Sequence, residues 1–318
     1  MSSVAKPHRT TPAAVTVRRA VVVTRPTLYD ELLERHGTRG QIDFVLRDRG
    51  RNIAELDAAH AAQQAALHTV GGGVPLAWRR AHVDRADLDR FLFEPDDVVV
   101  AVGPDGLVAN LAKYLDGQPV IGVDAGDGRS VGRLTATRPG DVAAMLTRSD
   151  NDSSLTYQEL TMVEAELDDG RKLRALNEVF VGHRSHQSAR YTLTIGQQRE
   201  RQSSSGLIVS SGTGATGWAA SIHRATQCGL PLPKVDDPHL LLLVREAWPS
   251  AITGTDLVAA TVTPDEPCTI TSAMEGGTVF GDGIEADPLP FDHGRTVTVR
   301  PSPARLRLVL APDEGGNS

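Results

Sequence analysis

The sequence is poor in aromatic residues and in cysteine. Phenylalanine, tryptophan and tyrosine together make up 4% of its 318 residues, so any core must be built from Val, Leu, Ile and Ala. Two cysteines, Cys228 and Cys268, are too few for a disulfide framework, which favours a reducing, cytoplasmic compartment. With 40% hydrophobic and 23% charged residues, the composition is that of an ordinary globular protein.

An excess of basic residues and a long apolar run are also missing. The formal net charge is −7, whereas proteins that bind nucleic acids or membrane surfaces usually carry a basic face. No apolar run approaches the roughly 18 residues of a membrane helix, so we expect neither kind of partner. Residues 1–16 are rich in Ser, Thr, Pro and Ala, as in a transit peptide, but lack the apolar core of a secretory signal. We expect disordered tails at 1–16 and 312–318.

The first part of the chain alternates between strand and helix patterns. Apolar runs predict strands at 19–24, 97–102 and 119–123, of the kind buried in a parallel sheet. Apolar residues at helical spacing predict helices at 29–36, 52–68 and 107–115, the second of them stopped by the glycines at 71–73. Strand, helix and strand at this spacing form a βαβ unit. We therefore expect residues 17–149 to form an α/β domain.

The pattern changes after about residue 149. Gly, Asp and Pro turns separate predicted strands at 155–167, 175–181, 189–195, 206–210, 240–244, 268–272, 296–300 and 301–310. One clear helix is predicted, at 218–228, and the polar, Ser-rich residues 197–205 are expected to form a loop. Residues 150–311 are thus predicted to form a β-rich domain.

Two strand–helix junctions carry candidate phosphate-binding turns. Gly103-Pro104-Asp105-Gly106 follows an apolar strand, and the amides at a helix N-terminus favour an anion, although Pro-Asp-Gly is also a common tight turn. The segment Ser210 to Trp218 reads SSGTGATGW. Its glycines allow close backbone approach and its threonine hydroxyls can bond phosphate or ribose, but a flexible connector has the same composition.

Two shorter signals occur in the β-rich part. Asn177-Glu178 lies in an apolar strand context, where an amide beside a carboxylate can bind an adenine edge and a ribose hydroxyl, or simply cap a hairpin. Gly281-Asp282-Gly283 has the composition of a plain turn. Neither pattern is specific by itself.

Taken in this order, the four segments resemble the motifs of the NAD kinase family, within the diacylglycerol-kinase-like superfamily. The family's Gly-Gly-Asp-Gly-Thr loop corresponds to 103–107, its Asn-Glu pair to Asn177-Glu178, its Thr/Gly-rich segment to 206–218 and its late Asp-Gly to Asp282-Gly283. The similarity covers about 97–310. Residues 119–123, and then Arg129 and Gly132, look closest to the mitochondrial-type branch.

The resemblance implies an α/β N-terminal nucleotide-binding domain followed by an all-β sandwich C-terminal domain, with the active site between them. Asp105 would act on the acceptor hydroxyl as general base or orienting group, and Gly103, Gly106 and Arg129 would bind the donor's phosphates. The acceptor would contact Asn177, Glu178, Thr213, Thr216, Trp218 and Ser221, with Asp282 nearby. Mg²⁺ would arrive with ATP. The family's assembly through the β domain implies a homodimer or homotetramer.

Several positions depart from the family pattern. Pro104 replaces a glycine and therefore lacks a backbone N–H. Leu107 replaces a threonine and lacks its hydroxyl. Both changes are expected to weaken the binding of a triphosphate, because each removes a potential hydrogen-bond donor. Ser205 and Trp218 stand where many members carry Asp and Tyr.

We therefore predict a kinase that phosphorylates a hydroxyl of a nucleotide-like acceptor, NAD first among the candidates. A kinase acting on a sugar, nucleoside or polyol, and a non-catalytic dinucleotide-binding protein, are the alternatives. The donor, ATP or polyphosphate, stays open.

Overall fold

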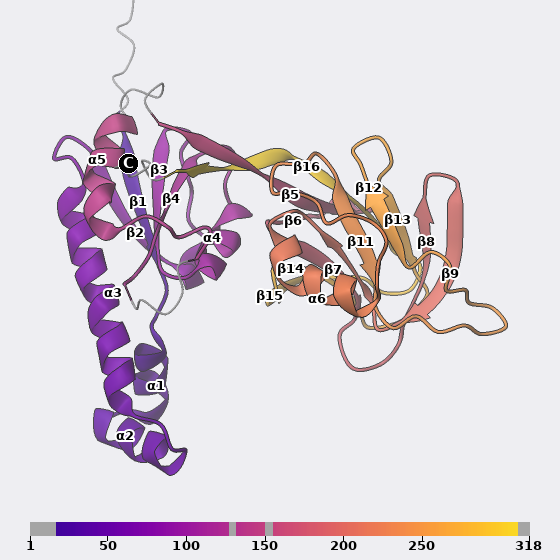
Figure 1. Cartoon of the computed structure of the whole chain (residues 1–318), viewed down its shortest axis with the longest axis horizontal. Coiled ribbons are helices and arrows are strands. Elements are labelled where there is room, and N and C mark those ends of the chain that lie inside the picture. The colour runs from indigo at the N-terminus through magenta and orange to yellow at the C-terminus, as the bar shows by residue number, and fades with distance from the viewer. Residues whose placement is uncertain (1–16, 127–131, 150–154, 311–318) are drawn as a thin grey trace, which may run out of the picture.

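The computed structural model describes residues 17–126, 132–149 and 155–310, so both expected tails lie outside the described residues. The chain has two halves, an α/β half that ends with residue 149 and a β half that begins at residue 155 (Figure 1). Within the described ranges, no helix is both long enough and apolar enough to cross a membrane.

The α/β half is built on a short parallel sheet. Its strands are β1 (Arg19–Thr24), β2 (Arg79–Asp84), β3 (Asp97–Val102) and β4 (Pro119–Val123), in the spatial order β2-β1-β3-β4. Its helices are α1 (Leu28–His36), α2 (Arg39–Asp48), α3 (Ile53–Gly73), α4 (Asp105–Ala112) and α5 (Val142–Ser149). All six residues of β3 are buried, because helices cover both faces of a parallel sheet.

Alternate residues of the parallel strands pack against different helices. Val98 and Val100 of β3 join a core cluster with α3 and α5 on one face, whereas Val99 and Ala101 join a cluster with α4 on the other. The lower part of α3 packs with α1 and α2 through a small cluster that includes Ile42 and Leu56. These helices form an arm that extends away from the sheet (Figure 1).

The β half contains two sheets and one helix. The strands are β5 (Tyr157–Leu167), β6 (Lys172–Ala175), β7 (Glu178–His183), β8 (Ala189–Ile195), β9 (Gln198–Ser204), β10 (Leu207–Ser210), β11 (Leu240–Val244), β12 (Ala259–Val262), β13 (Cys268–Ser272), β14 (Gly277–Gly281), β15 (Ile284–Pro290) and β16 (Thr296–Val309). The helix is α6 (Trp218–Ala225). One core cluster draws residues from both sheets, for example Leu193 of β8 and Val209 of β10. The predicted β sandwich is confirmed.

One long sheet runs through both halves. β16 pairs in parallel with β4 of the α/β half and antiparallel with β13 of the β half. β5 lies antiparallel along β16, with a shift in register between Pro301 and Arg305. The halves are therefore joined by backbone hydrogen bonds of a shared sheet.

The structure corrects four expectations. Residues 197–205 form not a loop but β9, whose polar residues pair with β8 at the sheet edge. The predicted strand 175–181 is two strands, β6 and β7, separated at Leu176 and Asn177. The two predicted strands after residue 296 are one strand, β16. Helix α3 includes the three glycines expected to stop it, and a Cβ on Gly73 would lie 3.0 Å from the Ala143 Cβ of α5, so this glycine permits close helix packing.

Candidate active site

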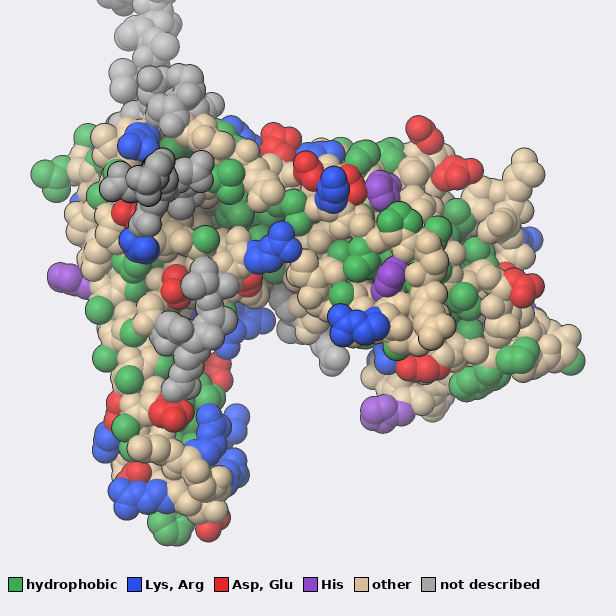
Figure 2. Space-filling model, in the orientation of Figure 1, with side chains coloured by type: hydrophobic (Ala, Val, Ile, Leu, Met, Phe, Trp, Pro, Cys, Tyr) green, Lys and Arg blue, Asp and Glu red, His purple; other side chains and the backbone are tan. Residues whose placement is uncertain are grey.

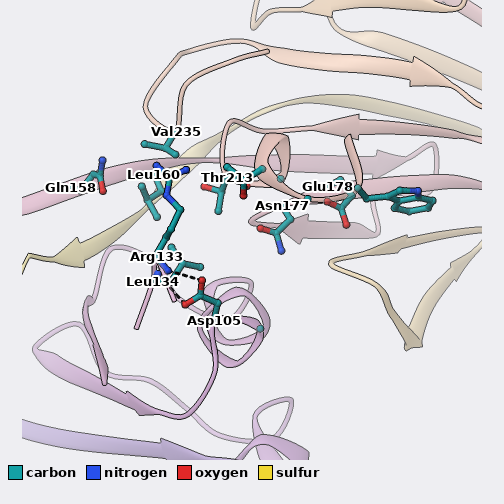
Figure 3. Close-up of a pocket in the computed structure, with 14 residues that line it drawn as sticks. Asp105, Arg133, Leu134, Gln158, Leu160, Asn177, Glu178, Thr213 and Val235 are labelled. Atoms are coloured by element: carbon teal, nitrogen blue, oxygen red, sulfur yellow. Dashed lines mark hydrogen bonds between the residues drawn. The ribbon is translucent and has the colours of Figure 1, made fainter. Parts of the chain in front are cut away.

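A pocket of about 290 Å³ lies where the two halves meet. The α/β half contributes Asp105, Gly106, Arg133 and Leu134. The β half contributes Gln158, Leu160, Asn177, Glu178, Thr213, Gly214, Thr216, Gly217, Trp218 and Val235. Figure 3 shows the Asp105 carboxylate below this space and the Thr213, Asn177 and Glu178 side chains along its upper wall. Asp105 therefore faces the Thr213–Thr216 segment across one pocket.

Asp105 is the first residue of α4, and its side chain is held by the segment that follows residue 131. Its Oδ1 accepts hydrogen bonds from the amides of Leu134 and Thr135, both at 3.0 Å, and from the Thr135 hydroxyl at 2.9 Å. Its Oδ2 accepts one hydrogen bond, from the Arg133 amide at 2.8 Å. Since a carboxylate oxygen can accept more than one hydrogen bond, Oδ2 has acceptor capacity left for a ligand.

Glycines make this close approach possible. A Cβ on Gly132 would lie 1.9 Å from Asp105 Oδ1, and one on Gly122 of β4 would lie 1.8 Å from the Leu134 carbonyl oxygen. Neither separation is compatible with a side chain. The Gly132 that entered the family resemblance is thus explained by its contact with the carboxylate.

The turn before α4 has fewer phosphate-binding groups than a glycine-rich loop, because of Pro104 and Leu107. Gly103 has φ +153° and its amide donates to the Val123 carbonyl at 3.1 Å. Pro104 is exposed and supplies no N–H. Leu107 is 1% exposed, because its side chain packs in the core beneath the turn. The hydroxyl expected at this position is replaced by a core contact.

Asn177 and Glu178 are fixed from behind by Asp282. The Asp282 carboxylate accepts hydrogen bonds from the amide of Leu176 at 3.0 Å and from that of Asn177 at 2.6 Å. The Asp282 amide in turn donates to the Glu178 carbonyl at 3.0 Å. Asp282 has φ +55°, in a turn that directs its carboxylate inward. Asp282, which the sequence predicted near the site, is not among the described lining residues. It supports the pocket wall from behind, through its hydrogen bonds to the amides of Leu176 and Asn177.

Both buried carboxyl groups have raised pKa values. Burial, and then the negative charge of Asp282, raise the pKa of Glu178 to about 7. Burial raises the pKa of Asp282 to about 6, against the lowering effect of the backbone amides and of Lys113. A carboxyl group with a displaced pKa at a pocket wall is typical of a functional site.

The loop after β10 packs directly on these residues. A Cβ on Gly214 would lie 2.4 Å from the Asn177 carbonyl oxygen, and one on Gly212 would lie 1.8 Å from that of Lys234. The glycines thus allow the loop to fit between two stretches of protein backbone. Thr213 Oγ1 lines the pocket, is buried, and has no hydrogen-bond partner within the described part of the chain, so it can bond a ligand.

Trp218 stands at the start of α6, between two cavities. Its ring stacks on Phe180 with centroids 6.0 Å apart, and the Arg245 guanidinium lies 5.1 Å from the ring centroid. A second cavity of about 600 Å³, lined by residues that include Trp218, Phe180 and Arg245, adjoins it.

The structure brings seven of the predicted site residues together and leaves others apart. Asp105, Gly106, Asn177, Glu178, Thr213, Thr216 and Trp218 line the pocket. Gly103 is not among the described residues that line it. Ser221 is exposed on α6, and its hydroxyl donates to the Gly217 carbonyl of its own helix at 3.4 Å. Arg129 lies outside the described residues.

Sequence reasoning missed five lining residues outside the predicted segments, namely Arg133, Leu134, Gln158, Leu160 and Val235. Two further lining residues, Gly214 and Gly217, are glycines of the predicted segment 210–218. Gln158 and Leu160 lie on β5, where residues two apart share a face, so the strand pattern held a weak signal for them. Arg133 follows Gly132 directly, but nothing local shows that it faces a pocket.

The arrangement suits phosphoryl transfer to a hydroxyl group. A carboxylate with a free acceptor position lies at a helix N-terminus, where an anion is favoured. Hydroxyl, amide and carboxyl groups on the opposite wall can bind a polar acceptor. On the face that Figure 2 shows, charges of both signs are interspersed, and a deep notch separates the helical arm from the β half.

Known proteins with related sequences are NAD kinases, although no protein-family model matches the chain. The NAD kinase of Azotobacter vinelandii is 30% identical over 237 residues, which cover 69% of this chain and 72% of that protein. The NAD kinase of Chlorobaculum tepidum is 26% identical over 235 residues, which cover 71% of this chain and 74% of that protein.

Solved structures of the same fold span nearly the whole chain. An NAD kinase from Archaeoglobus fulgidus, determined in complex with ATP, matches with a TM-score of 0.56 at 19% identity, covering 92% of this chain and 93% of that one. Yeast NADH kinase, complexed with NADH, matches with a TM-score of 0.58 at 13% identity, covering 94% and 85%. These two structures establish the fold, and the relatives of similar sequence establish the family. The chain belongs to the NAD kinase family.

Proposed function

We propose that this protein transfers the γ-phosphoryl group of ATP to a ribose hydroxyl of NAD, forming NADP. The single observation that carries the proposal is the pocket where the halves meet. It places Asp105 at the N-terminus of α4 opposite Asn177, Glu178 and Thr213. The assignment of roles to these residues is supported by their geometry and by the similarity of the chain to NAD kinases.

Asp105 is assigned to the hydroxyl that is phosphorylated. Its Oδ1 accepts three hydrogen bonds from Leu134 and Thr135, whereas Oδ2 accepts one. The acceptor hydroxyl would donate to Oδ2, attack the γ-phosphorus and leave its proton on the carboxylate as the bond to the β–γ bridging oxygen breaks. The backbone hydrogen bonds to Asp105 fix its orientation, so little rotational entropy is lost when the acceptor binds.

The acceptor's adenosine end is assigned to the opposite wall. The Glu178 carboxylate would accept hydrogen bonds from a ribose diol, and the Asn177 amide can both donate to and accept from a base edge. The unpartnered Thr213 hydroxyl, with Thr216, completes this polar wall.

Mg²⁺ is proposed to arrive bound to ATP. Among the described residues, no group of three or more His, Cys, Asp or Glu side chains is placed to hold a metal ion, and Mg²⁺ commonly binds through substrate phosphates and water. When bound, the ion neutralises charge on the donor's phosphates. No residue of this chain is assigned to it.

The direct test is product formation. Purified protein incubated with ATP, Mg²⁺ and NAD should yield NADP, measured with an NADP-specific dehydrogenase, and a parallel reaction with polyphosphate tests the donor. Absence of product, alongside an active NAD kinase as control, would contradict the proposal.

Asp105→Asn should lower kcat by about 10²- to 10⁴-fold, because the amide cannot take up the proton. Asp96→Asn, at an exposed position of the same half, is the matched control and should keep full activity. Equal activity of the two variants would show that Asp105 has no chemical role.

Four further proposals accompany the activity. We propose a division of the chain into domains of residues 17–149 and 150–311, and a homodimer or homotetramer, which light scattering in solution can measure. A cytoplasmic location is supported by the two free thiols, Cys228 and Cys268, since paired cysteines are typical of oxidising compartments. We also propose that the partners are small nucleotides, without nucleic acid or membrane.

A further inference from the structure

Arg133 is the one positively charged side chain among the described residues that line the pocket between the halves. Two of the other lining residues, Asp105 and Glu178, carry carboxyl groups, and a third carboxyl group, that of Asp282, lies behind the wall. An acceptor that contains phosphate would enter this space as an anion. Without a cation, the carboxylates would repel it.

The main chain of Arg133 is fixed at the reacting centre. Its amide donates to Asp105 Oδ2 at 2.8 Å, and the next amide, of Leu134, donates to Oδ1 at 3.0 Å. Gly132, just before it, lies so close to the carboxylate that no side chain fits there. The position at which the Arg133 side chain leaves the backbone is therefore determined by Asp105.

The side chain extends away from that carboxylate. Figure 3 shows it rising from beside Leu134 toward Leu160 on β5, on the way to the wall that carries Thr213. Arg133 is exposed, and a guanidinium presents a planar set of N–H donors. Such a fork matches two oxygens of a phosphate group.

We propose that Arg133 binds the phosphate linkage of the acceptor, and so makes the pocket selective for a dinucleotide over a free nucleoside or sugar. The inference rests on the proposed function and adds to it a residue that determines the substrate class. The donor's phosphates are the weaker assignment for this guanidinium, because Gly106 is the one glycine of the donor-side turn in the described pocket lining, which lacks Gly103. Several acceptor-side residues, by contrast, line the pocket with Arg133.

Binding measurements without turnover test the proposal. Calorimetric or competition titrations of wild-type protein and of Arg133→Gln would use NAD, adenosine and Mg-ATP as probes. The variant should bind NAD about 10- to 100-fold more weakly, the range expected for a lost charge-assisted hydrogen-bond pair. Adenosine, which has no phosphate, and Mg-ATP should change by less than about twofold. Arg133→Lys, which keeps the charge but loses the fork, should fall between the two.

Arg199→Gln is the control, since Arg199 is an exposed residue of the distant strand β9. Unchanged NAD affinity in Arg133→Gln would overturn the role of Arg133 and leave the proposed function standing. Equal weakening of adenosine and NAD, or a larger loss for Mg-ATP, would also overturn it. If wild-type protein binds neither NAD nor adenosine, the proposed function fails, and this inference fails with it.

Discussion

At the scale of residues, the pair Glu178 and Asp282 is expected to make the proposed binding of the acceptor depend on pH. The pKa of Glu178 is raised to about 7 by burial and by the nearby charge of Asp282, so this carboxyl group titrates close to neutral pH. An ionised carboxylate can accept two hydrogen bonds from a diol such as that of the proposed ribose, whereas a protonated carboxyl group donates one of its own.

We predict that the KM for NAD rises as the pH falls through about 7, because protonated Glu178 loses an acceptor position. In Glu178→Gln the KM should be about tenfold higher at pH 8, the loss expected for one charge-assisted hydrogen bond, and should no longer change near pH 7. Initial rates at saturating ATP measure this. A variant that keeps the wild-type pH profile would assign the titration to another group.

The same group affects stability in the opposite sense. Because its folded pKa lies above the ordinary value of 4.5, the folded protein holds a proton that the unfolded chain releases, and stability decreases as the pH rises from about 4.5 to about 7. Glu178→Gln should therefore raise Tm at pH 8, by roughly 2–4 °C per kcal/mol of removed penalty, and much less at pH 5. An equal shift at both pH values would contradict this.

At the scale of elements, the segment from Gly132 to Thr135 acts as a cradle for Asp105. A Cβ at residue 132 would lie 1.9 Å from Asp105 Oδ1, so Gly132→Ala should displace either the segment or the carboxylate. We predict a fall in kcat of about 10- to 100-fold, since an error of about 1 Å in a reacting group has this cost.

Gly140→Ala is the matched control for this change. Gly140 has no atom within 4 Å of its added Cβ, so its substitution should leave kcat unchanged. Measured kcat values for the two variants, with circular dichroism to confirm that both are folded, decide the matter. Full activity in Gly132→Ala would show that the hydrogen bonds to Asp105 do not position it for catalysis.

At the scale of the whole molecule, β16 is the element on which both halves depend. It supplies a neighbour to β4 in the α/β half and to β5 and β13 in the β half. Its side chains enter cores on both sides, with Leu306 packed beside α4 and Val297 packed in the sandwich. The pocket is lined by residues of both these packed units.

Removal of β16 by truncation after Arg295 should therefore prevent both halves from folding, because the strand's three partners would lose backbone hydrogen bonds and apolar contacts together. A urea titration followed by fluorescence and circular dichroism should show no cooperative transition. Truncation after Leu310, which keeps every described strand, is the control. A cooperative transition in the shorter chain would show that one half folds without β16.

How much the sequence could predict depends on whether a feature is local. The runs Arg19–Thr24, Asp97–Val102 and Pro119–Val123 were predicted with the bounds that the structure has, because a continuous apolar run has to be buried whatever surrounds it. β9 was missed because its residues are polar, and the backbone pairing with β8 that makes it a strand is a tertiary contact. Pattern within a segment cannot reveal such pairing.

The sequence by itself determined the α/β-then-β architecture, the family resemblance and half of the residues that line the pocket, since these follow from patterns and motifs within short segments. Only the tertiary structure decided that Asp282 supports Asn177 from behind and that Arg133, whose amide bonds Asp105, lines the same pocket as Asn177. The reason is physical. These relations are distances between segments far apart in the chain, and folding, rather than local residue preference, sets them.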